Sequence, residues 1–384
     1  MQNFCQRNKP ANGKVGFMAR FKRIKAPKSP YMNYLLMLAA PAIVSWYYYG
    51  ALAFRAILTG IISAVAVEAV ALLIMKKKLN CLSDMHAVFT GFAIAMLLPA
   101  TAPIWLIGAG AAFAILVAKI PFGPAHKAPF VPAAAGMAFL TVCFPDEVFK
   151  YPAIDSASFD VFDAGSSLAA QLSAGGIQHV NSVGIMSMIS GNVAGPLGTC
   201  CAVALLGSCA LLTAGKPKRL FNVLGFLTVC SLLAVIFPRG SFSRPVSLLT
   251  ELCAGSLLFS GIFFVTDPGT SPKHPLTRFI YGAFAGIICM ILRYFGTFED
   301  GTCFGILLTN AFWPIVDSSL RKIGYHKFIE KSMAKSAEKR KQKAALKGGE
   351  PARVQAENTH SPTRCSAARS FTTRCSSRRQ VSAR

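Results

Sequence analysis

Ten long apolar segments that follow one another along the chain constrain its fold more than any other feature. They cover roughly residues 31–50, 52–75, 82–98, 103–121, 128–145, 198–215, 219–238, 244–265, 276–294 and 301–318. Several hold only about 17–20 residues, which is enough to cross a bilayer core of roughly 30 Å as a helix. The mean hydropathy of +0.47, with 53% hydrophobic residues, is too high for a soluble domain of 384 residues. We therefore predict an all-α polytopic membrane protein with about ten transmembrane helices.

The apolar segments form two groups of five, separated by a polar interval and flanked by basic ends. The predicted parts are a basic N-terminal segment (1–30), a first five-helix repeat (31–145), an extracytoplasmic loop (146–195), a second five-helix repeat (196–320) and a basic, disordered tail (321–384). The two ends carry most of the net charge of +24, because the first holds eight Lys or Arg and the second seventeen. Such ends indicate cytoplasmic flanks that also favour anionic lipid, and no nucleic-acid partner is expected.

Two proline-rich breaks occupy corresponding positions in the two groups. Pro99–Pro103 reads P-A-T-A-P, and Pro268–Pro272 reads P-G-T-S-P after an apolar run. An odd number of spans in each group makes the repeat an inverted one. Paired interruptions of this kind mark the functional centre of many transporters, so we expect the two breaks to meet near the bilayer midplane. The plain alternative is a pair of ordinary loops between helices.

Four polar residues are candidates for an ion path. Asp267 ends the apolar run before the second break, with Thr266 and Thr270 beside it, and Glu68 lies inside the second apolar segment. Ionisable groups inside a membrane are costly and usually mark ion paths or buried partners. The alternatives are helix capping for Asp267 and the two threonines, and hydrogen-bonded packing for Glu68. The twelve cysteines lack metal-binding spacing, and neither a metal site nor a catalytic residue is predicted.

Several motifs together resemble the D subunit of the Rnf electron transport complex and the related B subunit of the sodium-pumping NADH:quinone reductase. The second half contains T-D-P-x-T-S-P from Thr266, a span that closes on R-x-F-G at Arg293, and a run from Phe304 to Asp317. The first half is similar at Thr90-Gly91, and the resemblance covers about residues 31–320. It implies a bacterial inner-membrane subunit that carries flavin and part of the ion path. No dinucleotide-binding fingerprint is present.

The predicted flavin site departs from the family pattern. The family attaches FMN to the threonine of S-G-A-T-P-L in an outer loop, and the matching stretch here is Gly165-Ser166-Ser167-Leu168. Ser167 then stands near the place of the threonine, with Gly165 supplying a turn. The resemblance implies FMN at Ser167, with riboflavin as a second flavin, and Thr90 and Gly91 as further cofactor-binding residues. The changed hydroxyl and one missing residue leave covalent attachment open.

The resemblance implies a subunit of a redox-driven ion translocase. In such a complex, electron transfer between ferredoxin and NAD is coupled to movement of Na⁺ or H⁺, and the partners are other Rnf-type membrane and soluble subunits. Two other classes stay open, namely a transporter or channel without redox chemistry on the same inverted repeat, and a structural subunit that only scaffolds partners.

The distribution of Lys and Arg predicts the topology. We expect both termini in the cytoplasm and the 146–195 interval outside, because the interval is acidic and most other loops are basic. Reporter fusions at Lys77, Asp160 and Lys218 test this. Cytoplasmic reporter activity at Lys77 and Lys218 with none at Asp160 is expected, whereas a cytoplasmic Asp160 would exclude the inverted repeat.

Overall fold

The computed structural model describes residues 30–76, 85–123, 128–152, 164–165, 167–173, 186, 194–199, 201–215, 217–239 and 244–322. The chain divides into two units, residues 1–316 and residues 317–384. Only residues 317–322 of the second unit are described. The predictions for the segment before Pro30, for Lys77, for Asp160 and for the tail beyond Lys322 fall outside the described ranges.

The first five apolar segments each contain a helix. These helices are α1 (Pro30–Tyr49), α2 (Ala51–Ile74), α3 (His86–Leu97), α4 (Ile104–Phe113) and α5 (Pro132–Cys143). α4 continues directly into the π-helix η3 (Ala114–Lys119) and the 3-10 turn η4 (Ile120–Phe122). Short π-helical stretches are rare and often occur at functional sites, and this one ends at a buried charged residue, Lys119.

The second five apolar segments are also helical, but one of them is bent. The elements are α10 (Ala202–Gly215), η7 (Pro217–Arg219), α11 (Leu220–Ile236), α12 (Arg244–Cys253), α13 (Leu257–Phe263), α14 (Pro275–Phe295) and α15 (Thr302–Lys322). α12 and α13 together form the eighth apolar segment and meet at 62°. The interruption of this segment therefore comes before α13 as well as after it.

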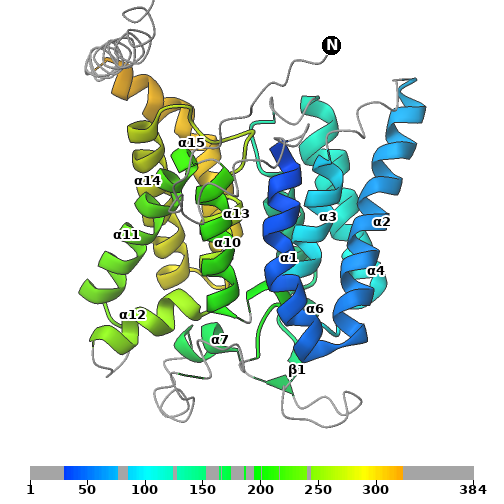
Figure 1. The fold of residues 1–384 in the computed structure, drawn as a ribbon, viewed down its shortest axis with the longest axis horizontal. Coiled ribbons are helices and arrows are strands. Elements are labelled where there is room, and N and C mark those ends of the chain that lie inside the picture. Colours follow the sequence, from blue (N-terminus) through cyan, green and yellow to red (C-terminus); the bar gives the residue numbers. More distant parts are fainter. Residues whose placement is uncertain are drawn as a thin grey trace, which may run out of the picture. The chain divides into compact units, whose positions relative to one another are not determined.

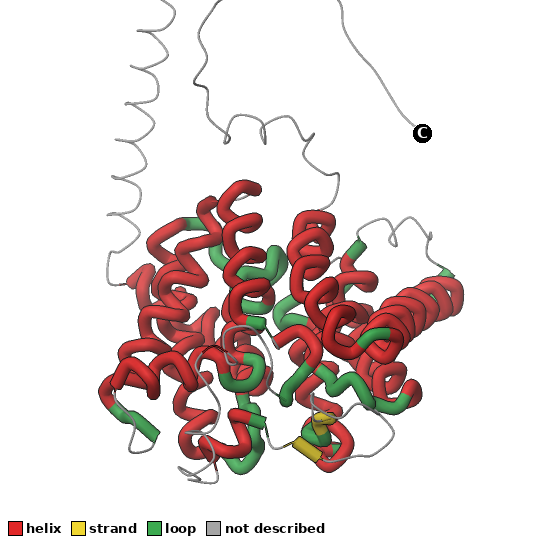
Figure 2. The backbone as a smooth tube through the Cα atoms, turned by 60° about the horizontal axis from the view of Figure 1, so that its bottom comes forward, coloured by secondary structure: helices red, strands yellow, loops and turns green. Residues whose placement is uncertain are grey.

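Short elements join the two halves at one face of the first unit. They are α6 (Pro145–Val148), β1 (Tyr151–Pro152), β2 (Ala164–Gly165), α7 (Leu168–Ser173) and η6 (Leu197–Thr199). β1 and β2 pair antiparallel, with Tyr151 opposite Gly165 (Figure 2). We call this face the loop face, and we call the face at which α1 begins the N-terminal face (Figure 1).

The exposed surface of the helices identifies a membrane protein. Within the described ranges, five helices are long and apolar enough to cross a membrane, and six if the bent pair α12–α13 is counted as one span. α3, α5 and α10 are apolar but shorter. On α2, the side chains of Phe54, Ile62 and Leu73 are each more than half exposed, as expected for contact with lipid. The chain is thus an all-α polytopic membrane protein, while ten spans and inverted symmetry stay predictions.

The two halves meet where α1 packs against α10 (Figure 1). Pro41 lies inside α1 and has no backbone N–H, so the carbonyl of Met37, four residues earlier, loses its helical partner. The Ser208 hydroxyl on α10 donates to this carbonyl at 2.8 Å. A hydroxyl from the second half therefore satisfies a backbone group of the first half where no water is available.

Glycines allow two helix pairs to approach closely. Gly60 on α2 faces Gly91 on α3, and a Cβ on Gly91 would collide with the carbonyl oxygen of Gly60. On α14, a Cβ on Gly282 would collide with the carbonyl oxygen of Asn222 on α11. Small residues at such interfaces let the backbones of membrane helices pack directly against each other.

We predict that Gly91→Ala destabilises the protein and that Gly108→Ala does not. The added methyl group at Gly91 must separate α2 from α3, which costs about 1–3 kcal/mol of unfolding free energy. No atom lies within 4 Å of a Cβ at Gly108 on α4, so the same substitution there removes only a flexible helical residue. Thermal unfolding of both variants in detergent measures the difference, and equal unfolding midpoints would contradict the packing.

Candidate functional site

The interrupted end of α13 is stabilised by side chains from three other helices. The Tyr34 hydroxyl on α1 donates to the carbonyl oxygen of Thr266 at 2.5 Å, and Asn222 Nδ2 on α11 donates to the carbonyl oxygen of Val265 at 2.6 Å. Arg278 Nε on α14 donates to the carbonyl oxygen of Pro272 at 2.6 Å. These three carbonyls belong to the non-helical segment between α13 and α14, and in apolar surroundings backbone carbonyls outside a helix must find partners elsewhere.

Asp267 is buried at the centre of this break, with only 2% of its surface exposed. Its Oδ2 accepts the N–H of Gly269 at 2.8 Å, and the Tyr31 hydroxyl lies 3.4 Å from its Oδ1. The carboxylate thus closes a turn. It does not cap the next helix, because α14 begins at Pro275 with His274 as the preceding residue. The alternative that Asp267 caps a helix is therefore wrong.

The two threonines beside Asp267 lie in the same break. Thr266 is fully buried, and its hydroxyl donates to the carbonyl oxygen of Ile262 at 2.5 Å. The Tyr34 hydroxyl lies 3.0 Å from Thr266 Oγ1. Thr270 Oγ1 is also buried. Three of the four predicted ion-path residues therefore share one buried polar site.

Glu68, the fourth candidate, forms a buried ion pair with Lys119. Glu68 lies on α2 and is 3% exposed, and Lys119 at the end of η3 is 6% exposed. Glu68 Oε1 accepts from Lys119 Nζ, whereas Oε2 has no hydrogen-bond partner within the described residues. The pair shows that Glu68 takes part in packing, and an ion-path role for it stays a prediction.

His86 and Tyr31 lie between the ion pair and the break. The His86 imidazole is 1% exposed, and its centroid lies 4.5 Å from that of the Tyr31 ring. Lys119 is near enough for its charge to act on His86. Glu68, Lys119, His86, Tyr31 and Asp267 therefore form a buried polar series that runs from α2 of the first half to the break in the second half.

The structure does not bring the two proline-rich breaks together. Leu98, next to the first break, accepts the N–H of Leu197 at 3.1 Å, and the Ser45 hydroxyl lies 2.6 Å from the carbonyl oxygen of Leu197. Tyr31 and Tyr34 hold the second break. Ser45 and Tyr34 are separated along α1 by about 16 Å. The expected meeting at the midplane is wrong, because each break is fixed to a different end of α1.

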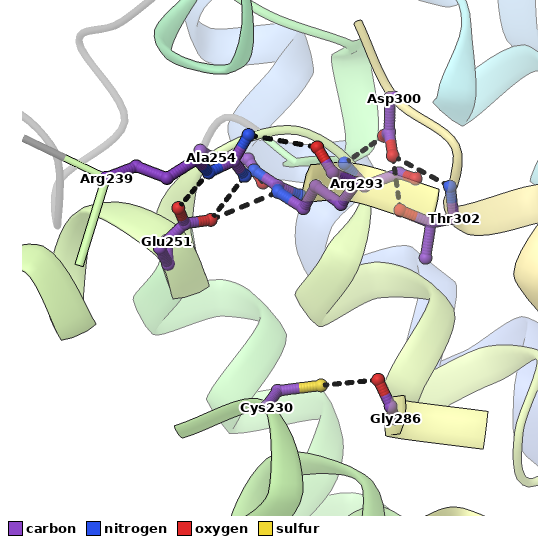
Figure 3. Close-up of polar contacts among 9 residues, drawn as sticks. Cys230, Arg239, Glu251, Ala254, Gly286, Arg293, Asp300 and Thr302 are labelled. Atoms are coloured by element: carbon purple, nitrogen blue, oxygen red, sulfur yellow. Dashed lines mark hydrogen bonds and ion pairs between the residues drawn. The ribbon is translucent and has the colours of Figure 1, made fainter. Parts of the chain in front are cut away.

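A second buried charge cluster lies at the loop face, between α12 and the end of α14 (Figure 3). Arg239 contacts both oxygens of Glu251, at 2.7 and 3.0 Å, and Arg293 Nε lies 3.2 Å from Glu251 Oε2. Arg293 also donates to the carbonyl oxygen of Ala254 at 2.9 Å. Glu251 is therefore a buried partner of two arginines, although its sequence position suggests an interfacial residue.

Ser167, the predicted flavin attachment point, is buried at the loop face. It is 3% exposed, its Oγ accepts the N–H of Ala170 at 3.0 Å, and its hydroxyl hydrogen-bonds Glu299. The adjoining cavity, also lined by Asp300, has a volume of about 20 Å³, which is room for roughly one water molecule. The charge of Asp300 beside this cavity also disfavours a phosphate group. These residues do not fit an FMN phosphoester.

The other predicted cofactor-binding residues have structural contacts. Gly165 lies in strand β2 and does not form the predicted turn. Thr90 is fully buried, and its hydroxyl donates to the carbonyl oxygen of His86 at 2.8 Å. Gly91 packs against Gly60, as described above. A cofactor role for Thr90 and Gly91 stays a prediction.

Sequence reasoning missed the residues that hold the site together. Tyr31, Tyr34 and His86 belong to no motif that predicts a role for them. Asn222 and Lys119 did leave a signal, because each is a polar residue within or at the end of an apolar segment. Asn222 lies 43 positions from its partner Val265, and Lys119 lies 51 positions from its partner Glu68. No local sequence pattern therefore reveals these pairings.

Comparison with known proteins identifies the family of this chain. The model of the NQR2, RnfD, RnfE family matches residues 23–325. The chain belongs to this family. The resemblance that rests on T-D-P-x-T-S-P and R-x-F-G is thereby confirmed.

Relatives within the NQR2, RnfD, RnfE family are named as the D subunit of an ion-translocating oxidoreductase complex. The protein of Cronobacter sakazakii is 28% identical over 322 residues, which cover 74% of this chain and 91% of the relative. Those of Citrobacter koseri and Salmonella typhi are 28% and 27% identical over 323 residues, with the same coverage.

We predict that Glu299 makes stability depend on pH. Burial, followed by the nearby charge of Asp300, raises the pKa of Glu299 from 4.5 to about 8. The folded protein therefore binds more protons than the unfolded chain between these values, and the unfolding free energy falls as pH rises through this window. Glu299→Gln should remove that part of the slope.

Thermal unfolding from about pH 5 to about pH 9 measures the effect. Glu147→Gln is the matched control, because Glu147 is an exposed glutamate on α6 at the same face. A slope that Glu299→Gln leaves unchanged would show that Glu299 ionises normally in the folded protein.

Proposed function

We propose that this chain is the membrane subunit of an Rnf-type ion-translocating oxidoreductase complex, in which electron transfer from ferredoxin to NAD, or the reverse, is coupled to movement of Na⁺ or H⁺. Membership in the family and the name of its relatives support the assignment to such a complex. The partners are the other membrane and soluble subunits of the complex, together with the lipid bilayer.

The observation that carries an ion-path role is the buried carboxylate of Asp267 in a broken helix. Carboxylate, hydroxyl and carbonyl oxygens suit Na⁺, and a buried carboxyl group can also take up H⁺. Asp267 offers such oxygens together with Thr266 and Thr270. The series through Tyr31, His86 and the Lys119–Glu68 pair would continue the path into the first half. The proposal covers either Na⁺ or H⁺ as the transported ion.

The charge distribution supports an orientation with the N-terminal face in the cytoplasm of a bacterial cell. Lys218, Arg219, Lys273 and Arg278 lie at or near that face, and cytoplasmic ends of membrane helices are enriched in such residues. Three arginines at the loop face are exceptions to this rule. Arg239 and Arg293 both contact Glu251, whereas Arg244 is exposed at the start of α12. The inner membrane with both termini cytoplasmic is the proposed location.

An inverted relationship between the halves is also proposed. Lys119 and Arg293 occupy corresponding positions, near the ends of the fourth apolar segment of each half. Each contacts a buried carboxylate, Glu68 for Lys119 and Glu251 for Arg293. The Arg293 contact lies at the loop face, while Lys119 lies near His86 and Tyr31 toward the N-terminal face. The carboxylate partners do not correspond, because Glu68 lies on the second apolar segment of its half and Glu251 on the third. Corresponding basic residues that lie toward opposite faces support an inverted repeat.

Flavin binding is a separate proposal that does not support the ion path. FMN, or riboflavin held without a covalent bond, is implied only by the family resemblance. Because Ser167 is buried beside Glu299 and Asp300, a transporter or channel without redox chemistry is the second candidate function. The two functions differ in whether ions move only when electrons are transferred.

We predict that Asp267→Asn lowers ion movement by about tenfold or more while the complex still assembles, because the variant keeps the hydrogen bond to Gly269 but loses the charge. The purified complex in proteoliposomes, driven by reduced ferredoxin and NAD, provides the measurement with ²²Na⁺ and a pH-sensitive dye. Asp146→Asn is the control, because Asp146 is an exposed carboxylate on α6.

Full ion movement in Asp267→Asn would contradict the role of Asp267. Ion movement by the chain alone, without any electron donor, would instead support the transporter or channel. Loss of electron transfer together with normal passive ion flow would place Asp267 in the redox chemistry and not in the path.

A further inference from the structure

A basic cavity opens at the N-terminal face beside the Asp267 break. It has a volume of about 300 Å³ and is lined by Pro217, Lys218, Arg219 and Arg278. Three of its four lining residues are cationic. Pro217 to Arg219 form η7, directly before α11, and Arg278 lies in the first turn of α14. The cavity therefore lies between the adjacent ends of two membrane helices.

The positive charge in this cavity is only partly neutralised by the described residues, because the charge of Asp267 acts on Arg219. None of their ion pairs includes Lys218, Arg219 or Arg278. Arg219 is only 8% exposed, and its guanidinium donates to the Tyr34 hydroxyl at 2.5 Å and lies over the Tyr34 ring. The Arg219 charge also acts on Arg278. The charge of one carboxylate acts on this group of three cations, so an anion in the cavity would reduce the repulsion between Arg219 and Arg278.

We propose that this cavity binds a phosphate group, supplied by the headgroup of an anionic phospholipid in the leaflet at the N-terminal face. The planar guanidinium fork matches phosphate oxygens, and a lysine adds a mobile point charge. Basic pockets between membrane helices on the cytoplasmic side commonly hold such headgroups. A soluble phosphate compound has the same chemistry and is the alternative source.

Phosphate binding would stabilise the break that contains Asp267. Arg219 contacts Tyr34, which holds the carbonyl of Thr266 before Asp267. Arg278 holds the carbonyl of Pro272 at the other end of the break. An anion between the two guanidiniums would therefore fix both residues that hold the ends of this segment. Lipid composition would then influence the geometry around Asp267, whichever ion the complex moves.

The test is lipid binding to the full chain purified in detergent, measured by native mass spectrometry and by thermal unfolding. The probes are phosphatidylglycerol, phosphatidylcholine of the same acyl chains, and inorganic phosphate. Lys218→Gln is the main variant, because Lys218 is exposed and its loss leaves the hydrogen bonds of the break intact. Lys76→Gln, at an exposed lysine after α2 at the same face, is the matched control.

We expect phosphatidylglycerol to be retained and to raise the unfolding temperature, whereas phosphatidylcholine does not. Lys218→Gln should weaken phosphatidylglycerol binding about fivefold, and Lys76→Gln should leave it unchanged. Arg278→Gln should weaken it further. The basic ends of the chain also attract anionic lipid. The test is therefore the difference in phosphatidylglycerol binding between Lys218→Gln and Lys76→Gln.

Equal binding of the two lipids, or equal weakening by Lys218→Gln and Lys76→Gln, would overturn the proposal. Protection by inorganic phosphate that Lys218→Gln removes would keep the phosphate site and assign it to a soluble ligand. Since the readout is binding, it is independent of ion movement and electron transfer, and it can fail or succeed separately from the proposed function.

Discussion

The structure depends on satisfying the backbone of a helix that ends inside apolar surroundings. After α13, the carbonyls of Val265, Thr266 and Pro272 accept hydrogen bonds from Asn222, Tyr34 and Arg278. These donors come from three different helices, so the break fixes α1, α11 and α14 relative to one another. An unsatisfied carbonyl in such a place costs several kcal/mol. The same contacts that remove this cost position Asp267.

Among the described residues, some charged side chains form close ion pairs and others do not. Glu68 with Lys119, and Glu251 with Arg239 and Arg293, are compensated by close contacts. Arg219 and Arg278 form no ion pair within the described residues, although the charge of Asp267 acts on Arg219, and both arginines border the cavity beside the break. This incompletely compensated charge lies where a ligand can reach it and where a ligand would affect Asp267.

The fold was more predictable from sequence than the site was. Long apolar segments gave the helices, because only a helix satisfies its own backbone in a membrane, and Pro268 with Gly269 marked the break. The partners Tyr34, His86 and Asn222 were not predictable, because they depend on which helices pack together. The bend between α12 and α13, the strand position of Gly165 and the burial of Ser167 were likewise decided by tertiary contacts.

Access to the break from each side of the membrane tests the central claim most directly. A cysteine at Ser271, a half-buried position, can be treated with a membrane-impermeant maleimide in vesicles of either orientation, with the parent chain as the background. The account predicts slow labelling from the cytoplasmic side only, and labelling several-fold faster when Asn222→Leu removes one of the capping donors. Labelling from the outside, or a labelling rate that Asn222→Leu leaves unchanged, would contradict this account.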